Sequence, residues 1–156
     1  MLIDDYFFSK LKLISIIFLV LFIFSKQSYS NELDKISACA GVVMGDGAAE
    51  LRDLQNESNF DNAFELAIKA FYGEGLSTPR SEEDITIAES ILASNVDKIY
   101  MQPEWTAEVY EEVIRCYRIL GLKVLEKSDL IKNNIDMINQ YLNKYKARLK
   151  RMINAG

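Results

Sequence analysis

Hydrophobic residues recur three and four positions apart along most of the chain. The pattern is clear in five stretches, at about 32–54, 58–71, 82–100, 104–126 and 129–153. This spacing lines one face of an α-helix, whereas no stretch shows the strict alternation of a half-buried β-strand. The pattern therefore predicts an all-α fold, a single small domain of about five helices packed as a bundle or orthogonally.

Polar residues and glycines indicate where two of these helices begin and where one ends. Ser58 with Asp61, and Ser81 with Asp84, have the spacing of a capping box, in which each side chain satisfies a backbone N–H of the other residue. The segment YGEGLSTPR, residues 72–80, holds two glycines and a proline. Such a combination is typical of a loop, so the second helix is expected to end there.

The fourth and fifth stretches differ in their apolar faces. The fourth, which Pro103 is expected to open, is apolar on two neighbouring faces, so we expect it to lie at the centre of the bundle. The fifth has a heptad seam, which predicts either a core face or a homodimer interface through residues 129–153. The seam residues are Ile131, Ile135, Ile138, Leu142, Tyr145, Leu149 and Met152.

Small residues dominate ISACAGVVMGDGAAEL, residues 36–51, within the first stretch. Gly41 and Gly45 lie four positions apart on one helix face, where they allow a second helix to approach closely. Together with Gly47 they also weaken the helix, so a kink or break is expected. The segment lacks the spacing of a phosphate-binding loop and of a calcium-binding EF-hand. We therefore interpret it as a site of close helix packing.

The sequence has two cysteines, Cys39 and Cys116. An even number of cysteines in an exported protein indicates a disulfide. We expect these two to bond, with the small residues bringing the first and fourth helices close enough for the bridge. The alternative is a pair of buried free thiols. A reactive thiol is disfavoured because the chain has no histidine to activate one.

The N-terminus has the layout of a secretory signal peptide. Residues 13–24, apolar except for Ser15, follow two lysines and precede Ser28 and Ser30, which have the small-x-small spacing of a cleavage site. We predict that residues 1–30 are a cleaved signal peptide and that residues 31–156 form the mature domain, in the periplasm or outside the cell. The alternative is an uncleaved membrane anchor, although a comfortable span needs about 20 apolar residues.

The composition excludes several classes of function. The chain has no histidine, which removes histidine-based catalytic triads and most zinc and haem sites. Residues 31–127 carry nineteen acidic and nine basic side chains, and such an acidic body disfavours nucleic-acid binding. The acidic residues at 82–84 and 104–112 are interpreted as solvated helix faces. We therefore expect no catalytic residue, no metal site and no cofactor.

Two groups of residues are candidates for a partner-binding surface. Lys144, Arg148 and Arg151 share one face at the basic end of the fifth helix, which suits an acidic protein patch or peripheral contact with anionic lipid. Four tyrosines could line a groove between the fourth and fifth helices, since tyrosine combines an apolar ring with a polar tip. These tyrosines are Tyr110, Tyr117, Tyr141 and Tyr145.

Taken together, these features favour a non-catalytic protein-binding or accessory protein of the cell envelope, whose partner is another exported protein. Two alternatives remain open. One is a carrier of a small apolar ligand held among the helices. The other is a small enzyme that uses carboxylates on cell-wall polymers, which would have a cleft with two acidic side chains, one of them with a raised pKa.

Overall fold

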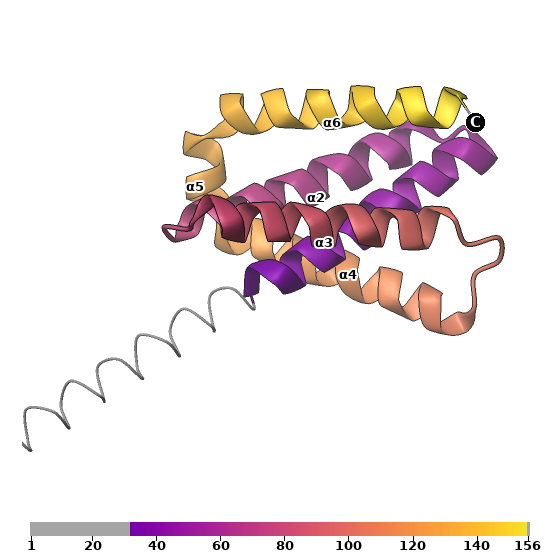
Figure 1. The fold of residues 1–156 in the computed structure, drawn as a ribbon, viewed down its shortest axis with the longest axis horizontal. Helices are drawn as coiled ribbons and strands as arrows, with labels where there is room; N and C mark the ends of the chain where they lie inside the picture. Colours follow the sequence, from indigo (N-terminus) through magenta and orange to yellow (C-terminus); the bar gives the residue numbers. More distant parts are fainter. Residues whose placement is uncertain (1–31, 156) are drawn as a thin grey trace, which may run out of the picture. The chain divides into compact units, whose positions relative to one another are not determined.

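The computed structural model describes residues 32–155, which form six helices and no strand. This confirms the all-α prediction, with one helix more than expected; the predicted signal peptide, residues 1–30, lies outside the described residues. Between residues 32 and 155, no helix is both long and apolar enough to span a membrane. The helices in chain order are residues 32–54, α2 (Glu57–Ser77), α3 (Glu82–Tyr100), α4 (Ala107–Glu126), α5 (Ser128–Asn133) and α6 (Ile135–Ala155) (Figure 1).

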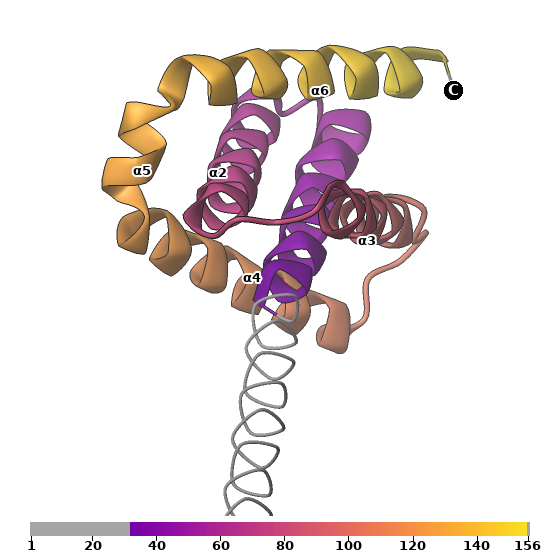
Figure 2. The same cartoon turned by 60° about the vertical axis from the view of Figure 1, so that its left-hand side comes forward.

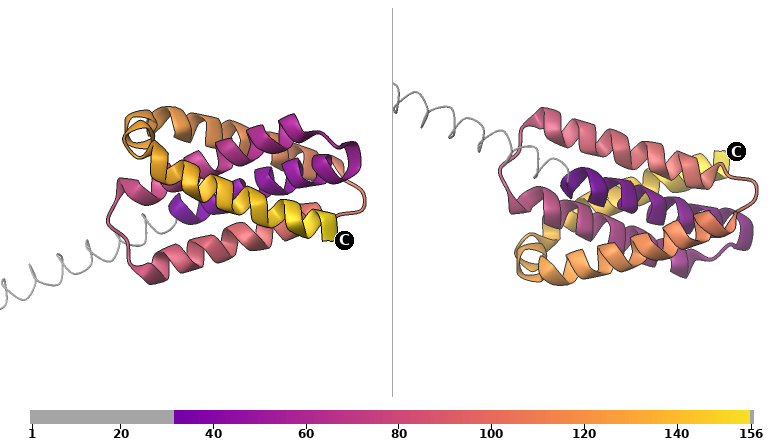
Figure 3. Two further views of the ribbon diagram at one scale, coloured as in Figure 1. Left: turned by 90° about the horizontal axis from the view of Figure 1, so that it is seen from above. Right: turned by 90° about the horizontal axis from the view of Figure 1, so that it is seen from below.

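The helix over residues 32–54 is the central helix of the fold. Every residue from 39 to 49 is buried, because other helices surround this segment (Figures 2 and 3). The expectation that the fourth helix would be central is wrong. Helix α4 buries one face but leaves its neighbouring face in solvent, where four large apolar side chains are 55–72% exposed: Tyr110, Ile114, Leu122 and Leu125. The enclosed helix is thus the one with small side chains, residues 32–54, and not the one with the wide apolar arc, α4.

Helix α2 lies beside the central helix and packs against α4, α5 and α6. The predicted apolar stripe of this helix is fully or almost fully buried, so the 3.6-residue period identified its inner face correctly. The stripe residues are Phe60, Phe64, Ala67, Ile68 and Phe71. Most of the domain core is therefore formed by the central helix and α2, with the other helices covering them.

Side-chain caps fix where two of the helices begin. The predicted capping box of Ser81 and Asp84 opens α3, with both reciprocal hydrogen bonds formed. The box predicted at Ser58 is wrong, because α2 already begins at the preceding residue. The Asn56 side chain accepts a hydrogen bond from the backbone N–H of Asn59 and caps the helix instead. Asparagine is as good an N-cap as serine, so Asn56 and Ser58 are equally plausible capping residues when only the sequence is considered.

Helix α2 ends at Ser77, within residues 72–80 as predicted, but the two glycines of this segment lie inside the helix and do not end it. A Cβ at Gly73 would lie 3.1 Å from two side-chain carbons of Ile131 in α5. The glycine therefore gives α5 room to pack against α2 and does not form a turn. A glycine that serves tertiary packing has the same sequence signature as one that breaks a helix.

The fourth and fifth helices also differ from the prediction at their ends. Helix α4 begins at Ala107 and is capped by the Thr106 side chain, so Pro103 lies in the preceding loop. The helix predicted over 129–153 is two helices, α5 and α6, separated at Asn134.

The heptad seam of α5 and α6 faces the protein's own core. Ile131, Ile138 and Leu142 are buried, whereas Met152 at the far end is 58% exposed. Helix α6 packs against α2 through this face. The seam is thus a core face for most of its length, which is the first of the two interpretations of the pattern.

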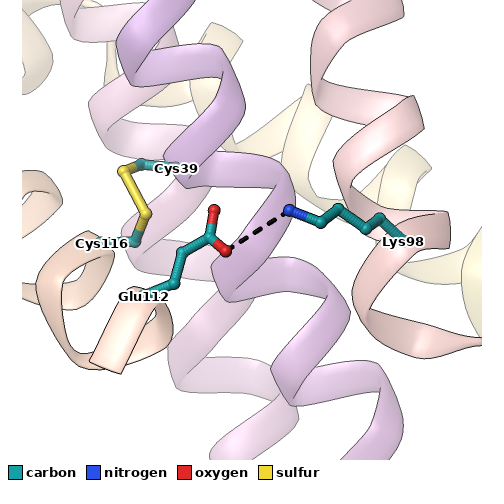
Figure 4. The surroundings of a disulfide bond; sticks show 4 residues. All are labelled: Cys39, Lys98, Glu112 and Cys116. Carbon is teal, nitrogen blue, oxygen red and sulfur yellow. Dashed lines mark hydrogen bonds and ion pairs between the residues drawn. A yellow bond between two sulfur atoms is a disulfide. The ribbon is translucent and has the colours of Figure 1, made fainter. Parts of the chain in front are cut away.

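Cys39 and Cys116 form a disulfide that joins the central helix to α4 (Figure 4). Their Cα atoms are 4.8 Å apart and the bond connects positions 77 residues apart in sequence. Nearby, Lys98 of α3 reaches Glu112 of α4, with 3.4 Å between Nζ and Oε2. The disulfide between Cys39 and Cys116 confirms the predicted pairing and is compatible with an oxidising compartment.

The three glycines of the central helix contact helices other than α4. A Cβ at Gly45 would lie 2.8 Å from the Cβ of Ile99 in α3, and Gly41 faces the same helix. A Cβ at Gly47 would lie 2.7 Å from the Cβ of Ala63 in α2. The glycines therefore bring α3 and α2 close, and the idea that they bring the two cysteines together is wrong. The helix also continues without the expected break.

Candidate functional site

An apolar groove lies between α3 and α6, with the central helix and α2 forming its floor. Its volume is about 240 Å³. We call it the α3–α6 groove. Its lining residues are Met44, Phe64, Leu92, Ala93, Val96, Asp97, Tyr145, Arg148, Leu149 and Met152. Two of the predicted partner-surface residues, Tyr145 and Arg148, are thus part of this groove, and the exposed Met152 lies on its rim.

One side of α6 is tied to α2 by ion pairs. Lys146 Nζ lies 2.8 Å from Asp61 Oδ1, and Lys150 Nζ lies 4.0 Å from Glu57 Oε2. These two lysines sit at the edge of the core and hold α6 on α2. Part of the basic character of this helix is therefore structural.

The other side of α6 carries the three cations predicted as a partner surface. Lys144, Arg148 and Arg151 are exposed, and none of them forms an ion pair with a side chain in the described part of the chain. They run along the helix beside the α3–α6 groove, which Asp97 borders from α3. The structure therefore places an apolar groove next to a row of unpaired positive charges.

Tyr141 and Tyr145 of the predicted tyrosine groove lie against α2. The ring of Tyr141 stacks on Tyr72, with centroids 4.6 Å apart. The Tyr145 hydroxyl lies 3.4 Å from Glu89 Oε1 and donates a hydrogen bond to it, which links α6 to α3. Burial raises the pKa of Tyr72 and of Tyr145, so both hydroxyls stay protonated and can act as donors.

Tyr110 and Tyr117 lie elsewhere, so the predicted groove between the fourth and fifth helices does not exist. Tyr110 contacts Trp105 edge-on, and Tyr117 points to Asp46 of the central helix. The reason is the packing order, because α4 and α6 both pack on α2, which lies between them (Figure 2). The helical period shows which residues share a face of one helix, but it could not show which helices are neighbours.

A second hollow lies between the end of the central helix, the loop before α4 and the first turn of α4. Its volume is about 560 Å³. We call it the Trp105 cavity. Its lining residues are Asp46, Ala49, Glu50, Arg52, Asp53, Leu54, Gln102, Pro103, Glu104, Trp105 and Tyr110. Four carboxylates and two aromatic rings therefore face one hollow that contains a single basic residue.

Asp46 is the most buried carboxylate of the Trp105 cavity, with 8% of its surface exposed. The Tyr117 hydroxyl donates a hydrogen bond to Asp46 Oδ2 over 2.7 Å. Burial raises the pKa of Asp46 and Glu50 adds repulsion, whereas the bond from Tyr117 acts in the opposite direction. A cleft with two acids, one of raised pKa, is the arrangement expected of the carboxylate-enzyme alternative.

Glu74, near the end of α2, is the other buried carboxylate among the described residues. Arg80 Nη2 lies 3.3 Å from its Oε1, and Lys123 Nζ lies 3.4 Å from its Oε2. All three side chains are largely shielded from solvent. This cluster joins α2, the loop before α3, and α4. Sequence reasoning missed it because Lys123 is distant in sequence and the spacing of Glu74 and Arg80 matches no helical period.

In the part of the chain that the structure describes, no group of three or more Cys, Asp or Glu side chains is arranged to hold a metal ion. Comparison of the chain with models of known families, with curated proteins and with solved structures finds no match. The function therefore has to follow from the chemistry of the two hollows.

Proposed function

We propose that the protein is an exported, non-catalytic binding protein, and that its α3–α6 groove receives an apolar side chain from an acidic amphipathic segment of a partner protein. The observation that carries the proposal is the row of exposed, unpaired cations, Lys144, Arg148 and Arg151, beside an apolar groove. A helix or strand with one apolar face and acidic flanks matches both features at once.

The size of the groove favours a side chain over a whole ligand. Its volume of about 240 Å³ exceeds that of a cavity of about 150 Å³ that binds benzene. It is smaller than the roughly 300–1,000 Å³ of a typical small-molecule pocket. One large apolar side chain fits this range, which supports the protein-binding function over the carrier of a small apolar ligand.

The basic residues of α6 fall into two groups, one with a structural role and one that we assign to partner binding. Lys146 and Lys150 already pair with acids of α2, so they contribute to the fold. Lys144, Arg148 and Arg151 have no such partner among the described residues. Exposed charges of one sign beside a groove increase the association rate of an oppositely charged partner and disfavour a basic one.

Export remains part of the proposal. The disulfide between the central helix and α4 supports an oxidising compartment, and the signal-peptide pattern of residues 1–30 agrees with it. The partner is accordingly expected to be another exported or envelope protein.

Site-specific photo-crosslinking in cells that make the protein tests the proposal. A photo-reactive residue at Ala93, which is exposed and lines the groove, should capture a partner through an apolar segment with acidic flanks, mapped by mass spectrometry. The same photo-reactive residue at the exposed Ser90, which lies on the same helix but does not line the groove, is the positional control.

Charge variants make the experiment specific. Replacing Lys144, Arg148 and Arg151 by Gln should lower the yield of the Ala93 adduct about tenfold, since each exposed pair contributes up to about 1 kcal/mol. A matched variant removes three other exposed charges and should leave the yield unchanged: Arg115→Gln, Arg118→Gln and Lys132→Gln. Equal adducts from Ala93 and Ser90, or an adduct with a second copy of this chain, would contradict the proposal.

A further inference from the structure

The two buried carboxylates of the described residues have opposite surroundings. Glu74 has two cations within 3.4 Å, Arg80 and Lys123. Asp46 is similarly buried but has no cation beside it, only the neutral hydroxyl of Tyr117 and the repulsion of Glu50. A buried carboxylate without a counter-charge is strongly unfavourable. Among the described residues, Asp46 therefore lacks the counter-charge that Glu74 has.

We propose that the Trp105 cavity binds a small protonated alkylamine, whose ammonium group donates a hydrogen bond to Asp46 and whose alkyl part lies against Trp105 and Tyr110. This site is separate from the α3–α6 groove and does not depend on the function proposed for that groove. Its ligand is defined by a positive charge with N–H donors at one end and an apolar body.

The free acceptor in this site is Asp46 Oδ1. Oδ2 is occupied by Tyr117, whereas Oδ1 accepts no hydrogen bond from the described residues. Asp46 as a whole residue is 8% exposed, and it lines the cavity. An ammonium N–H is the donor that would complete the hydrogen bonding of this carboxylate and neutralise its charge at the same time.

The one basic residue of the cavity is already engaged. Arg52 makes a two-pronged contact with Asp53, over 2.6 and 2.8 Å. Its Nη1 also donates to the backbone carbonyl of Tyr100 over 2.6 Å. Arg52 therefore neutralises Asp53, and the remaining carboxylates, Asp46, Glu50 and Glu104, leave the cavity with an excess of negative charge.

Two aromatic rings complete the site. Trp105 and Tyr110 both line the cavity, with ring centroids 5.1 Å apart in an edge-on arrangement. Aromatic faces attract cations and also contact alkyl groups. The volume of about 560 Å³ lies within the roughly 300–1,000 Å³ of small-molecule sites, so a free amine fits better than a macromolecular surface.

Tryptophan fluorescence of the full chain tests this proposal directly, because Trp105 is the one tryptophan of the sequence. Butylamine should change the emission with a saturable dose response, and putrescine should do the same. The neutral isostere 1-butanol should bind at least about tenfold more weakly, because a hydrogen bond to a charged group is lost. Isothermal titration calorimetry confirms each affinity independently.

Two variants distinguish binding of the amine at Asp46 from a general attraction between the amine and an acidic protein. Asp46→Asn keeps an oxygen acceptor for Tyr117 but presents no charge, so it should weaken butylamine binding about tenfold or more. Glu111→Gln removes an equal charge from the exposed surface outside the cavity and should leave the affinity unchanged. Circular dichroism and urea unfolding establish that both variants are folded.

Each other result overturns the proposal. Equal binding of butylamine and 1-butanol would show an apolar site, and no response to either amine would show that the cavity takes no such ligand. An unchanged affinity of Asp46→Asn for butylamine would show that the amine does not bind to the Asp46 carboxylate. Binding or cleavage of neutral oligosaccharides, with no response to amines, would instead support the carboxylate-enzyme alternative.

Discussion

The bond between Cys39 and Cys116 should account for a large part of the stability of this domain. It closes a loop of 77 residues between the central helix and α4. In the loop-entropy model a cross-link of this length stabilises the folded state by about 4.5 kcal/mol at 25 °C, by restricting the unfolded chain. Domains are stable by only about 5–15 kcal/mol in total. Loss of the bond is therefore expected to bring the protein close to unfolding.

Urea unfolding, followed by circular dichroism, measures this contribution. The oxidised protein is compared with the reduced protein, because reduction breaks the cross-link and leaves both sulfur atoms in the core. A double variant, Cys39→Ala with Cys116→Ala, adds the effect of removing two buried side chains. We expect a loss of about 4–5 kcal/mol on reduction, a somewhat larger loss in the variant, and a steeper denaturant dependence in both as the unfolded chain expands.

A loss on reduction below about 1 kcal/mol would refute the reasoning, since the loop-entropy term would then have to be absent or cancelled. It would show that the unfolded chain remains compact without the bond. A large loss in the alanine variant alone would assign the stabilisation to packing of the two side chains.

Four further substitutions test the packing and the buried charges, each by urea unfolding. Gly45→Ala should destabilise the protein by about 1–2 kcal/mol, because the added Cβ would lie 2.8 Å from Ile99 Cβ. Gly75→Ala should stabilise it by up to about 1 kcal/mol, because the added Cβ would have no neighbouring atom within 4 Å. Glu74→Gln should destabilise by about 1–3 kcal/mol, because it removes a buried charge that pairs with Arg80 and Lys123, while Lys123 keeps its ion pair with Glu126. Asp46→Asn should stabilise the protein at neutral pH. The pKa of Asp46 in the folded state is raised above the ordinary value of 3.8, so the contribution of Asp46 to stability is full at pH values below 3.8 and is lost as the pH rises through the folded-state pKa. The gain from Asp46→Asn should therefore disappear in acid, and a gain independent of pH would contradict this assignment.

The helices and their inner faces could be predicted from the sequence because both depend on local spacing. The capping box at Ser81 and the stripe that includes Phe64 are examples, since each is set by spacings of three or four residues along one helix. Helix ends that depend on tertiary contact could not be predicted. Gly73 has the sequence signature of a loop, but it lies inside α2 because Ile131 of α5 packs against it.

The candidate sites were only partly predictable for the same physical reason. The sequence predicts Arg148 as part of a basic face of one helix and Tyr145 as part of a groove between the fourth and fifth helices, whereas both line the α3–α6 groove. The contact between Asp46 and Tyr117 joins residues 71 positions apart. A helical period shows which face a residue occupies but not which helix covers that face. The contact between Asp46 and Tyr117 therefore had no signal in the sequence.

The position of Asp46 connects the packing of the central helix to the proposed amine site. This helix is enclosed because its side chains are small, and a side chain at position 46 must therefore lie among its neighbours. Packing does not require a charge there, since Ala48 and Ala49 fill adjacent positions of the same helix with apolar groups and are also buried. A carboxylate at this position destabilises the folded state unless a cation neutralises it. If the amine supplies that charge, the unliganded protein should be less stable than Asp46→Asn, and butylamine should reduce the difference because it stabilises the protein that retains Asp46 more than the variant.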